Sequence, residues 1–207
     1  MCKRLILIAL LAACVISASA LAAGSDPSSL KLGDQAPELE LNFVKGTPVT
    51  LAEGKGTDVY IVEFWATWCG PCLISIPHLT ELQKKYGHKG LVVVGITDED
   101  PSDVRPFLAK MGAKMDYRVA IDKYDVTNSR FMVPFGVEGI PHAFVIDKLG
   151  RLVWHGHPMD PLMERLIPVL LSQNISAPDG SAESDGGSAS KDDGSTSKTA
   201  HSDSFAH

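Results

Sequence analysis

The segment Trp68-Cys69-Gly70-Pro71-Cys72 constrains this chain more than any other feature, because of the residues on either side of it. Val59 to Trp65 is a nearly continuous run of β-branched and aromatic residues, a pattern typical of a buried parallel strand. Pro71 to Tyr86 has the composition and spacing of a helix. The two cysteines are therefore expected at a strand-to-helix turn, with the first at the N-terminus of the helix.

This position predicts a redox-active dithiol. Unpaired backbone N–H groups and the positive end of the helix dipole stabilise a thiolate at a helix N-terminus. Cys69 is therefore expected to be the nucleophile. Cys72 follows one helical turn later, where it can attack the mixed disulfide that Cys69 forms and close a Cys69–Cys72 bridge. Both cysteines are predicted to be catalytic.

Other uses of a cysteine pair were weighed against the residues present. A zinc site needs about four ligands, and no second Cys pair or regularly spaced His accompanies this one. Covalent haem attachment needs His after the second Cys, where this chain has Leu73. Peroxiredoxins have Thr three residues before the reactive Cys, whereas Ala66 stands there and Thr67 follows one place later. No metal or cofactor is expected, and a static disulfide stays open as an alternative.

Length and charge bound the class of protein. The chain has 207 residues, 44% of them hydrophobic and 21% charged, which fits one globular domain with tails. The net charge of -6 argues against a nucleic-acid partner. Four cysteines, two of them at positions 2 and 14, are too few and too unevenly placed for a disulfide scaffold.

Residues 1–23 have the order of a secretory signal: two cations, an apolar run and then small residues. Cleavage is expected between Ala20 and Ala23, followed by a short linker over 24–32. Two alternatives stay open, lipidation at Cys14 and an uncleaved membrane anchor over 5–23. All three place the body outside the cytoplasm, in the periplasm or cell envelope.

Residues 174–207 form the other tail, which is rich in Ser, Gly and Asp. Such a segment cannot bury enough apolar surface to offset the entropy of ordering it. We expect a disordered acidic tail with no assigned role.

The body, residues 33–173, alternates strand and helix patterns and predicts an α/β fold with a central mixed sheet flanked by helices. The final pair of strands is expected to form a hairpin, which adds an antiparallel edge. The predicted elements after Tyr86, in chain order, are a strand over 91–96, a helix over 100–112, a strand over 117–121, a weaker helix over 125–135, strands over 143–146 and 151–154, and a helix from 160.

Three separated motifs resemble the thioredoxin superfamily over about 33–173. Residues 64–72 resemble the thioredoxin active-site stretch, Pro77 matches the proline within its first helix, and Gly139-Ile140-Pro141 resembles the cis-proline loop. The opening segment 33–37 and the helix-plus-strand insertion over 101–121 are similar to exported TlpA-like and ResA-like redoxins.

The resemblance implies where a substrate docks. Pro141 is expected to be cis and to lie beside the two cysteines, so that the backbone of Ile140 pairs with an extended substrate segment. An ordinary trans proline at a strand start is the alternative. Trp68 is expected on an exposed docking rim, next to Gly70 and Pro71 between the cysteines, whereas Trp65 is expected in the core.

Glu63 interrupts the apolar run of the first long strand. A buried, unpaired carboxylate is costly, so this residue either faces water or has a function. The resemblance to thioredoxins puts Glu63 behind the second Cys, where a raised pKa would let it take the Cys72 proton.

The remaining histidines are interpreted structurally. His142, alone at a strand start, is expected to be structural rather than to tune the thiolate. The tract 154–158 contains His155 and His157 but no carboxylate or Cys partner, and is expected to be a loop. His78 and His88 are expected on the surface.

Together these patterns predict an exported thiol-disulfide oxidoreductase that reduces protein disulfides. The TlpA-like resemblance implies that its electrons come from a membrane-embedded thiol donor of the DsbD or CcdA type. Gly70-Pro71 between the cysteines is the thioredoxin-like pair, which favours a reductase over a disulfide-forming oxidase. A non-catalytic binding or assembly module of the same fold is the rival from another class. The physiological substrate stays open.

Overall fold

A computed structural model of the chain describes residues 30–175. The expectations for the signal segment 1–23 and for Cys14, and nearly all of the tail 174–207, lie outside the described residues. Within them, helices and strands follow one another in the order β1 (Asn42–Lys45), β2 (Val59–Phe64), α1 (Gly70–Tyr86), β3 (Leu91–Thr97), α2 (Pro101–Met111), β4 (Arg118–Ile121), α3 (Val126–Phe131), β5 (His142–Ile146), β6 (Leu152–Gly156) and α4 (Pro161–Ser172).

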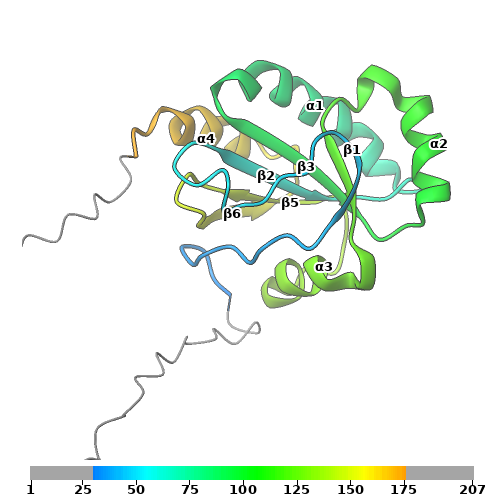
Figure 1. Cartoon of the computed structure of the whole chain (residues 1–207), viewed down its shortest axis with the longest axis horizontal. Helices are drawn as coiled ribbons and strands as arrows, with labels where there is room; N and C mark the ends of the chain where they lie inside the picture. Colours follow the sequence, from blue (N-terminus) through cyan, green and yellow to red (C-terminus); the bar gives the residue numbers. More distant parts are fainter. Residues whose placement is uncertain (1–29, 176–207) are drawn as a thin grey trace, which may run out of the picture. The chain divides into compact units, whose positions relative to one another are not determined.

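The strands form one mixed sheet in the order β1-β4-β3-β2-β5-β6 (Figure 1). β2, β3 and β4 are parallel, whereas β1, β5 and β6 run antiparallel to their neighbours. β2 therefore lies inside the sheet between β3 and β5, and all six of its residues are buried. The predicted α/β class, mixed sheet and final antiparallel hairpin are confirmed.

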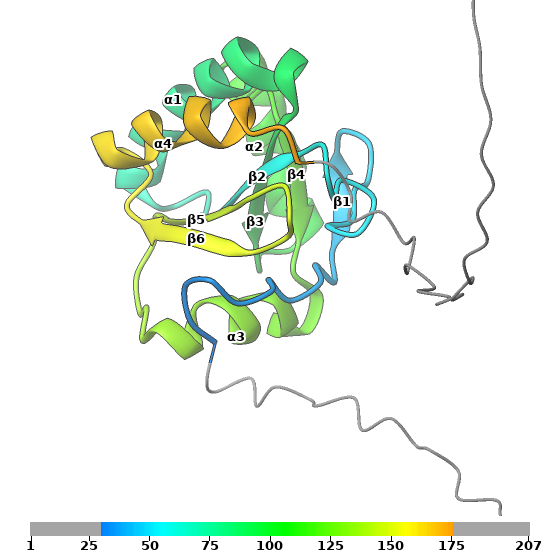
Figure 2. The ribbon, with the colours of Figure 1, turned by 90° about the vertical axis from the view of Figure 1, so that its left-hand side faces the viewer.

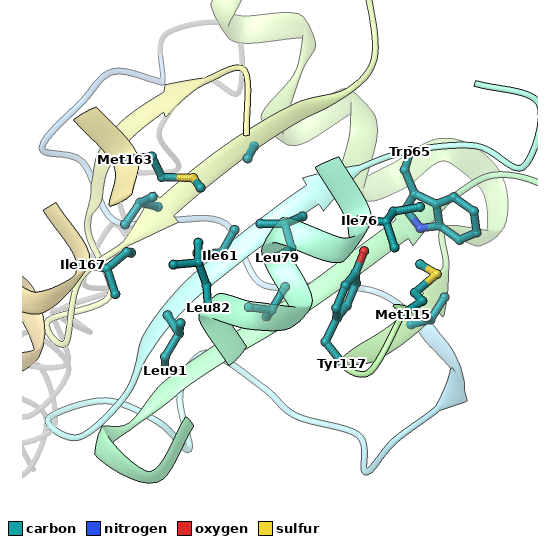
Figure 3. Close-up of a cluster of buried hydrophobic side chains, with 14 of the residues drawn as sticks. Ile61, Trp65, Ile76, Leu79, Leu82, Leu91, Met115, Tyr117, Met163 and Ile167 are labelled. Carbon is teal, nitrogen blue, oxygen red and sulfur yellow. The ribbon is translucent and has the colours of Figure 1, made fainter. Parts of the chain in front are cut away.

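Helices lie on both faces of the sheet (Figure 2). Each face carries its own apolar core. On one face Ile61 and Val93 pack with Leu79 of α1 and Ile167 of α4, and Val104 of α2 joins the same cluster. Figure 3 shows side chains of this cluster between the sheet and the helices. The other core includes Phe131 of α3. Because helices cover both faces of the sheet, every residue of the inner strands β2 and β3 is buried, and most of these residues are apolar.

Capping residues fix where α2 and α4 begin. Asp100 accepts a hydrogen bond from the backbone N–H of Ser102, and Asp160 accepts one from Leu162. Each is followed by a proline in the first turn, where the missing N–H costs nothing. The starts of α2 and α4 are therefore where the sequence predicts them.

Three elements differ from the prediction. The helix expected over 125–135 is broken into α3 and a short 3-10 turn, Val133–Phe135, with Pro134 in that turn. Asp122 rather than Asp125 accepts the first backbone bonds of α3, from Thr127 and Asn128. The second difference is β1, an edge strand that the sequence analysis did not identify.

The tract expected to be a loop is in part a strand. β6 continues through His155 to Gly156, because these residues pair with Phe144 and Ala143 of β5. The strand predicted over 151–154 is confirmed at Trp154, whereas the interpretation of His155 and Gly156 as loop residues is wrong.

The N-terminal segment is bound to the domain before β1. Leu30, inside the range 24–32 expected to be a linker, packs against the second core. The backbone N–H of Gly33 donates to Leu152, and that of Ala36 donates to Gly150. Within residues 30–175, no helix is both long and apolar enough to cross a bilayer.

Candidate active site

The two cysteines form a disulfide at the end of β2 where α1 begins. The S–S distance is 2.01 Å and the Cα atoms are 5.2 Å apart. Cys69 is the N-cap of α1, and its Sγ accepts a hydrogen bond of 3.2 Å from the backbone N–H of Cys72. Both cysteine residues are buried, Cys72 completely. The predicted strand-to-helix placement is confirmed, and the helix N-terminus faces the sulfur of Cys69.

The residues around Cys69 are exposed. Trp68 has 75% of its surface accessible, and Gly70 and Pro71 are also exposed. Trp65, three residues earlier, is only 2% exposed and packs against Phe107 of α2, with ring centroids 5.2 Å apart. The two tryptophans therefore take the expected places, one at the surface and one in the core.

The Ile140–Pro141 peptide bond is cis, as expected. His142, directly after it, pairs with Phe64 at the end of β2, so the proline loop and the dithiol lie at the same end of the sheet. A cavity of about 300 Å³ lies beside them. Its lining includes Trp68, Ile140, Val133, Asp98 and Glu138.

Glu63 is completely buried, so the alternative that it faces water is wrong. Burial raises its pKa to about 8, against hydrogen bonds from Tyr117 and Ser75 that lower it. The Tyr117 hydroxyl lies 3.3 Å from Glu63 Oε2, and the Ser75 hydroxyl lies 3.4 Å from Oε1. A carboxyl with this pKa can exchange a proton near neutral pH.

Ser75 connects this carboxyl to the dithiol helix. Its Oγ also lies 3.1 Å from the carbonyl oxygen of Cys72, one turn earlier in α1. Sequence reasoning missed both partners of Glu63. The three-residue spacing from Cys72 was a usable signal for Ser75, whereas Tyr117 is 54 positions from Glu63 and only the sheet order brings them together.

A second carboxylate holds the segment between β2 and α1. Glu99, just after β3, accepts the backbone N–H of Thr67 at 2.6 Å and the Thr67 hydroxyl at 2.6 Å. The Thr97 hydroxyl also donates to Glu99. Sequence analysis did not single out Glu99, which fixes the residue two places before Cys69.

His142 is not alone at its strand start. Its Nε2 lies 3.0 Å from Nδ1 of His155 on β6. Burial, followed by the charges of His155 and His157, lowers the pKa of His142 to about 4, so the ring is neutral at pH 7. In the part of the chain that the structure describes, no three His, Cys, Asp or Glu residues are arranged to hold a metal ion.

Known proteins with similar sequences are thiol-disulfide enzymes. The chain is 33% identical to the thiol-disulfide oxidoreductase ResA of Bacillus thuringiensis over 130 residues, which are 62% of this chain and 71% of the relative. It is 30% identical to the thiol:disulfide interchange protein HelX of Rhodobacter capsulatus over 134 residues, covering 62% and 71% of the two chains.

Solved structures and a family description agree with these relatives. A thiol:disulfide interchange protein of the thioredoxin family from Chlorobium tepidum superposes with a TM-score of 0.56 at 28% identity, covering 69% of this chain and 99% of that one. The AhpC/TSA family matches residues 32–155, which contain the strand, the dithiol helix and the proline loop. This chain therefore belongs to the AhpC/TSA family and is a thiol-disulfide oxidoreductase with a thioredoxin-like fold.

Proposed function

We propose that this protein reduces disulfides of protein substrates outside the cytoplasm by a relay between Cys69 and Cys72. The observation that carries the proposal is the Cys69–Cys72 pair at the N-terminus of α1, with the buried carboxyl of Glu63 connected to the same helix through Ser75. This arrangement combines an activated thiolate with a group able to accept a proton at neutral pH.

The relay has two exchange steps. The Cys69 thiolate attacks a substrate disulfide, forming a mixed disulfide and releasing one substrate sulfur as a thiolate. Glu63 then takes the proton of Cys72, whose thiolate attacks the Cys69 sulfur and releases the second substrate thiolate. The substrate gains two electrons, and the enzyme is left with the Cys69–Cys72 disulfide present in this structure.

Substrate docking is assigned to the exposed surface beside the disulfide. Trp68, Gly70 and Pro71 are exposed neighbours of Cys69 in the chain. Trp68 and Ile140, the residue before the cis proline, both line the cavity. We assign the Ile140 backbone to pair with an extended substrate segment, which would bring a substrate sulfur to Cys69.

Reduction needs a source of electrons, because each turnover leaves the enzyme oxidised. We propose a membrane-embedded thiol donor of the DsbD or CcdA type, with the protein exported by its N-terminal segment and either released, lipidated at Cys14 or anchored. The Gly70-Pro71 pair supports the reducing direction.

Turbidity of reduced insulin tests the relay. With dithiothreitol as electron source, wild-type protein should accelerate insulin reduction, and Cys72→Ser should lose nearly all of the acceleration while accumulating a mixed disulfide on Cys69. Cys69→Ser should form no mixed disulfide. Equal effects of wild type and Cys72→Ser would instead support a non-catalytic binding module.

Equilibration with glutathione buffers tests the direction. A reductase should be mostly oxidised in a buffer poised near -200 mV, as thioredoxin with about -270 mV would be. A dithiol that stays reduced there, as expected for an oxidant near about -120 mV, would support the oxidase alternative.

A further inference from the structure

Tyr117 reaches the Glu63 carboxyl across a glycine. Gly95 of β3 lies between them: it pairs with Glu63 on one side and with Val119 of β4 on the other. Tyr117 stands two residues before Val119 and so faces the same side of the sheet. A Cβ atom on Gly95 would lie 3.0 Å from the Tyr117 ring and 3.0 Å from the Trp65 indole nitrogen. The missing side chain at position 95 leaves room for the tyrosine.

The surroundings of Glu63 supply hydroxyl groups rather than charges. Its neighbours in the adjacent strands are Gly95 and Ala143, which carry no polar side chain. α1 contributes Ser75, whose hydroxyl also lies within reach of the Cys72 carbonyl oxygen. Among residues 30–175, no Lys, Arg or His forms an ion pair with Glu63. Its protonation therefore depends on burial and on two hydroxyl donors.

The hydrogens of this cluster can be assigned to acceptors one by one. The Ser75 hydroxyl is within reach of both Glu63 Oε1 and the Cys72 carbonyl oxygen, but it has a single hydrogen. If the acidic proton is on Oε1, Glu63 donates to Ser75, and Ser75 donates to Cys72. Tyr117 then donates to Oε2. Burial raises the pKa of Tyr117 well above its ordinary value, so its phenol keeps the hydrogen that it donates.

The alternative placement leaves one hydrogen unused. A proton on Oε2 would point at the Tyr117 oxygen, and the phenol hydrogen would then need an acceptor other than Glu63. A buried hydroxyl without an acceptor is costly. The geometry therefore favours Oε1, the oxygen on the side of Ser75 and the dithiol helix.

We propose that Tyr117 is a positioning residue that directs the acidic proton of Glu63 to Oε1 and stabilises the carboxylate once that proton has left. The inference rests on the proposed role of Glu63 as the base for Cys72. In the resolving step the carboxylate accepts the Cys72 proton at Oε1 while Tyr117 continues to donate to Oε2. Tyr117 itself exchanges no proton, and no electrons pass through it.

Carboxyl-carbon NMR titration of the oxidised, full-length protein tests the inference without relying on activity. The Glu63 resonance is identified by its loss in Glu63→Gln, and its midpoint should lie near pH 8. Tyr117→Phe removes a donor to the carboxylate, which should raise the midpoint by about one pH unit. An unchanged or lowered midpoint would overturn the inference.

Tyr60→Phe is the matched control. Tyr60 is also buried, but it belongs to the core on the other face of the sheet, and its hydroxyl donates to the Thr50 carbonyl at 3.0 Å. This variant should leave the Glu63 midpoint in place. An equal shift in both variants would show a general loosening of the domain and would also overturn the inference.

A second measurement covers the case in which Tyr117→Phe does not fold. Protein grown on 3-fluorotyrosine keeps the ring in place and gives a more acidic phenol, which is a stronger donor, so the Glu63 midpoint should fall. Tyr60→Phe labelled in the same way should show the same fall, because Tyr60 does not contact Glu63. A midpoint that does not fall on labelling would contradict the role of Tyr117.

Kinetics separate a failure of this inference from a failure of the proposed function. The pH profile for resolving a mixed disulfide should move to higher pH in Tyr117→Phe, and the same substitution made in Glu63→Gln should have no further effect. If Glu63→Gln resolves at the wild-type rate, the role of Glu63 as base is wrong, while the NMR midpoints still decide whether Tyr117 sets its protonation.

Discussion

At the scale of single residues, Glu63 should make the stability of the domain fall as pH rises. Its pKa is about 8 in the folded protein and 4.5 in the unfolded reference, so the folded state binds the extra proton between these values. The contribution of Glu63 to the free energy of unfolding is therefore fully present below about pH 4.5. It is lost progressively as the pH rises to about 8. Glu63→Gln removes this dependence, and by pH 9 the variant should be more stable than wild type by on the order of 4 kcal/mol.

Urea unfolding of the oxidised protein at pH 5, 7 and 9 measures this difference. Other groups titrate in both proteins, so only the difference between variant and wild type is informative. It should be smallest at pH 5 and should grow with pH. A constant difference would mean that Glu63 is ionised throughout this range, against the effect assigned to its burial.

Single residues also show where sequence reasoning was sufficient. The burial of Glu63 could be expected from its apolar neighbours in a central strand, and the exposure of Trp68 from its place beside the dithiol. Tyr117 and Glu99 could not be expected in the same way. Their partners lie 54 and 32 positions away in the chain, and a hydrogen bond across strands depends on register that local patterns do not contain.

At the scale of elements, the N-terminus of α1 should acidify Cys69. Its sulfur already accepts the backbone N–H of Cys72 in the oxidised state, and the helix dipole favours a thiolate there. In the reduced protein, the rate of alkylation by iodoacetamide should be measured against pH. The pH midpoint for Cys69 should lie clearly below the free thiol pKa of about 8.5, and the pH midpoint for Cys72 should lie above that of Cys69. Cys72→Ser and Cys69→Ser isolate the two thiols. Equal, unshifted midpoints would remove the basis for their different roles.

The segment between β2 and α1 should depend on Glu99. This carboxylate accepts both the N–H and the hydroxyl of Thr67, so Glu99→Ala should expose that amide. Hydrogen exchange at Thr67 should accelerate roughly tenfold or more, since a bond to a charged group contributes about 1.5–3 kcal/mol. Amides of α4 should keep their wild-type rates. Uniform acceleration over the whole domain would indicate global destabilisation instead.

Elements with strong local signals were predicted well, and those decided by tertiary pairing were not. Asp and Pro at the starts of α2 and α4 fix these helices by local hydrogen bonding. β1 has only four residues, one of them Lys and one Asn, and becomes a strand because β4 offers it an open edge. His155 was likewise assigned to a loop, although pairing with β5 extends β6 through it.

At the scale of the whole molecule, residues 30–175 should fold and catalyse without the flanking segments. The buried hydrophobic side chains of this part lie between Leu51 and Leu171, and residues 33–36 close the domain against the turn before β6. A 30–175 chain should keep the melting temperature and the insulin-reduction rate of a chain that begins at residue 24.

A matched truncation tests the N-terminal boundary. A 37–175 chain loses the backbone bonds from Gly33 to Leu152, from Ala36 to Gly150 and from Leu152 to Asp34. Its melting temperature should fall by roughly 5 °C or more, given about 1 kcal/mol for each bond. If the 30–175 and 37–175 chains have the same melting temperature, the segment before β1 contributes no stability.

The hydroxyl pair around Glu63 has a consequence for ionic strength. Dissolved ions screen interactions between exposed charges, but they act weakly on a buried group whose proton affinity depends on desolvation and two hydroxyls. The Glu63 midpoint should therefore be the same in 20 mM and in 500 mM sodium chloride. An enzyme tuned in this way would keep one pH profile whether the surrounding medium is dilute or saline.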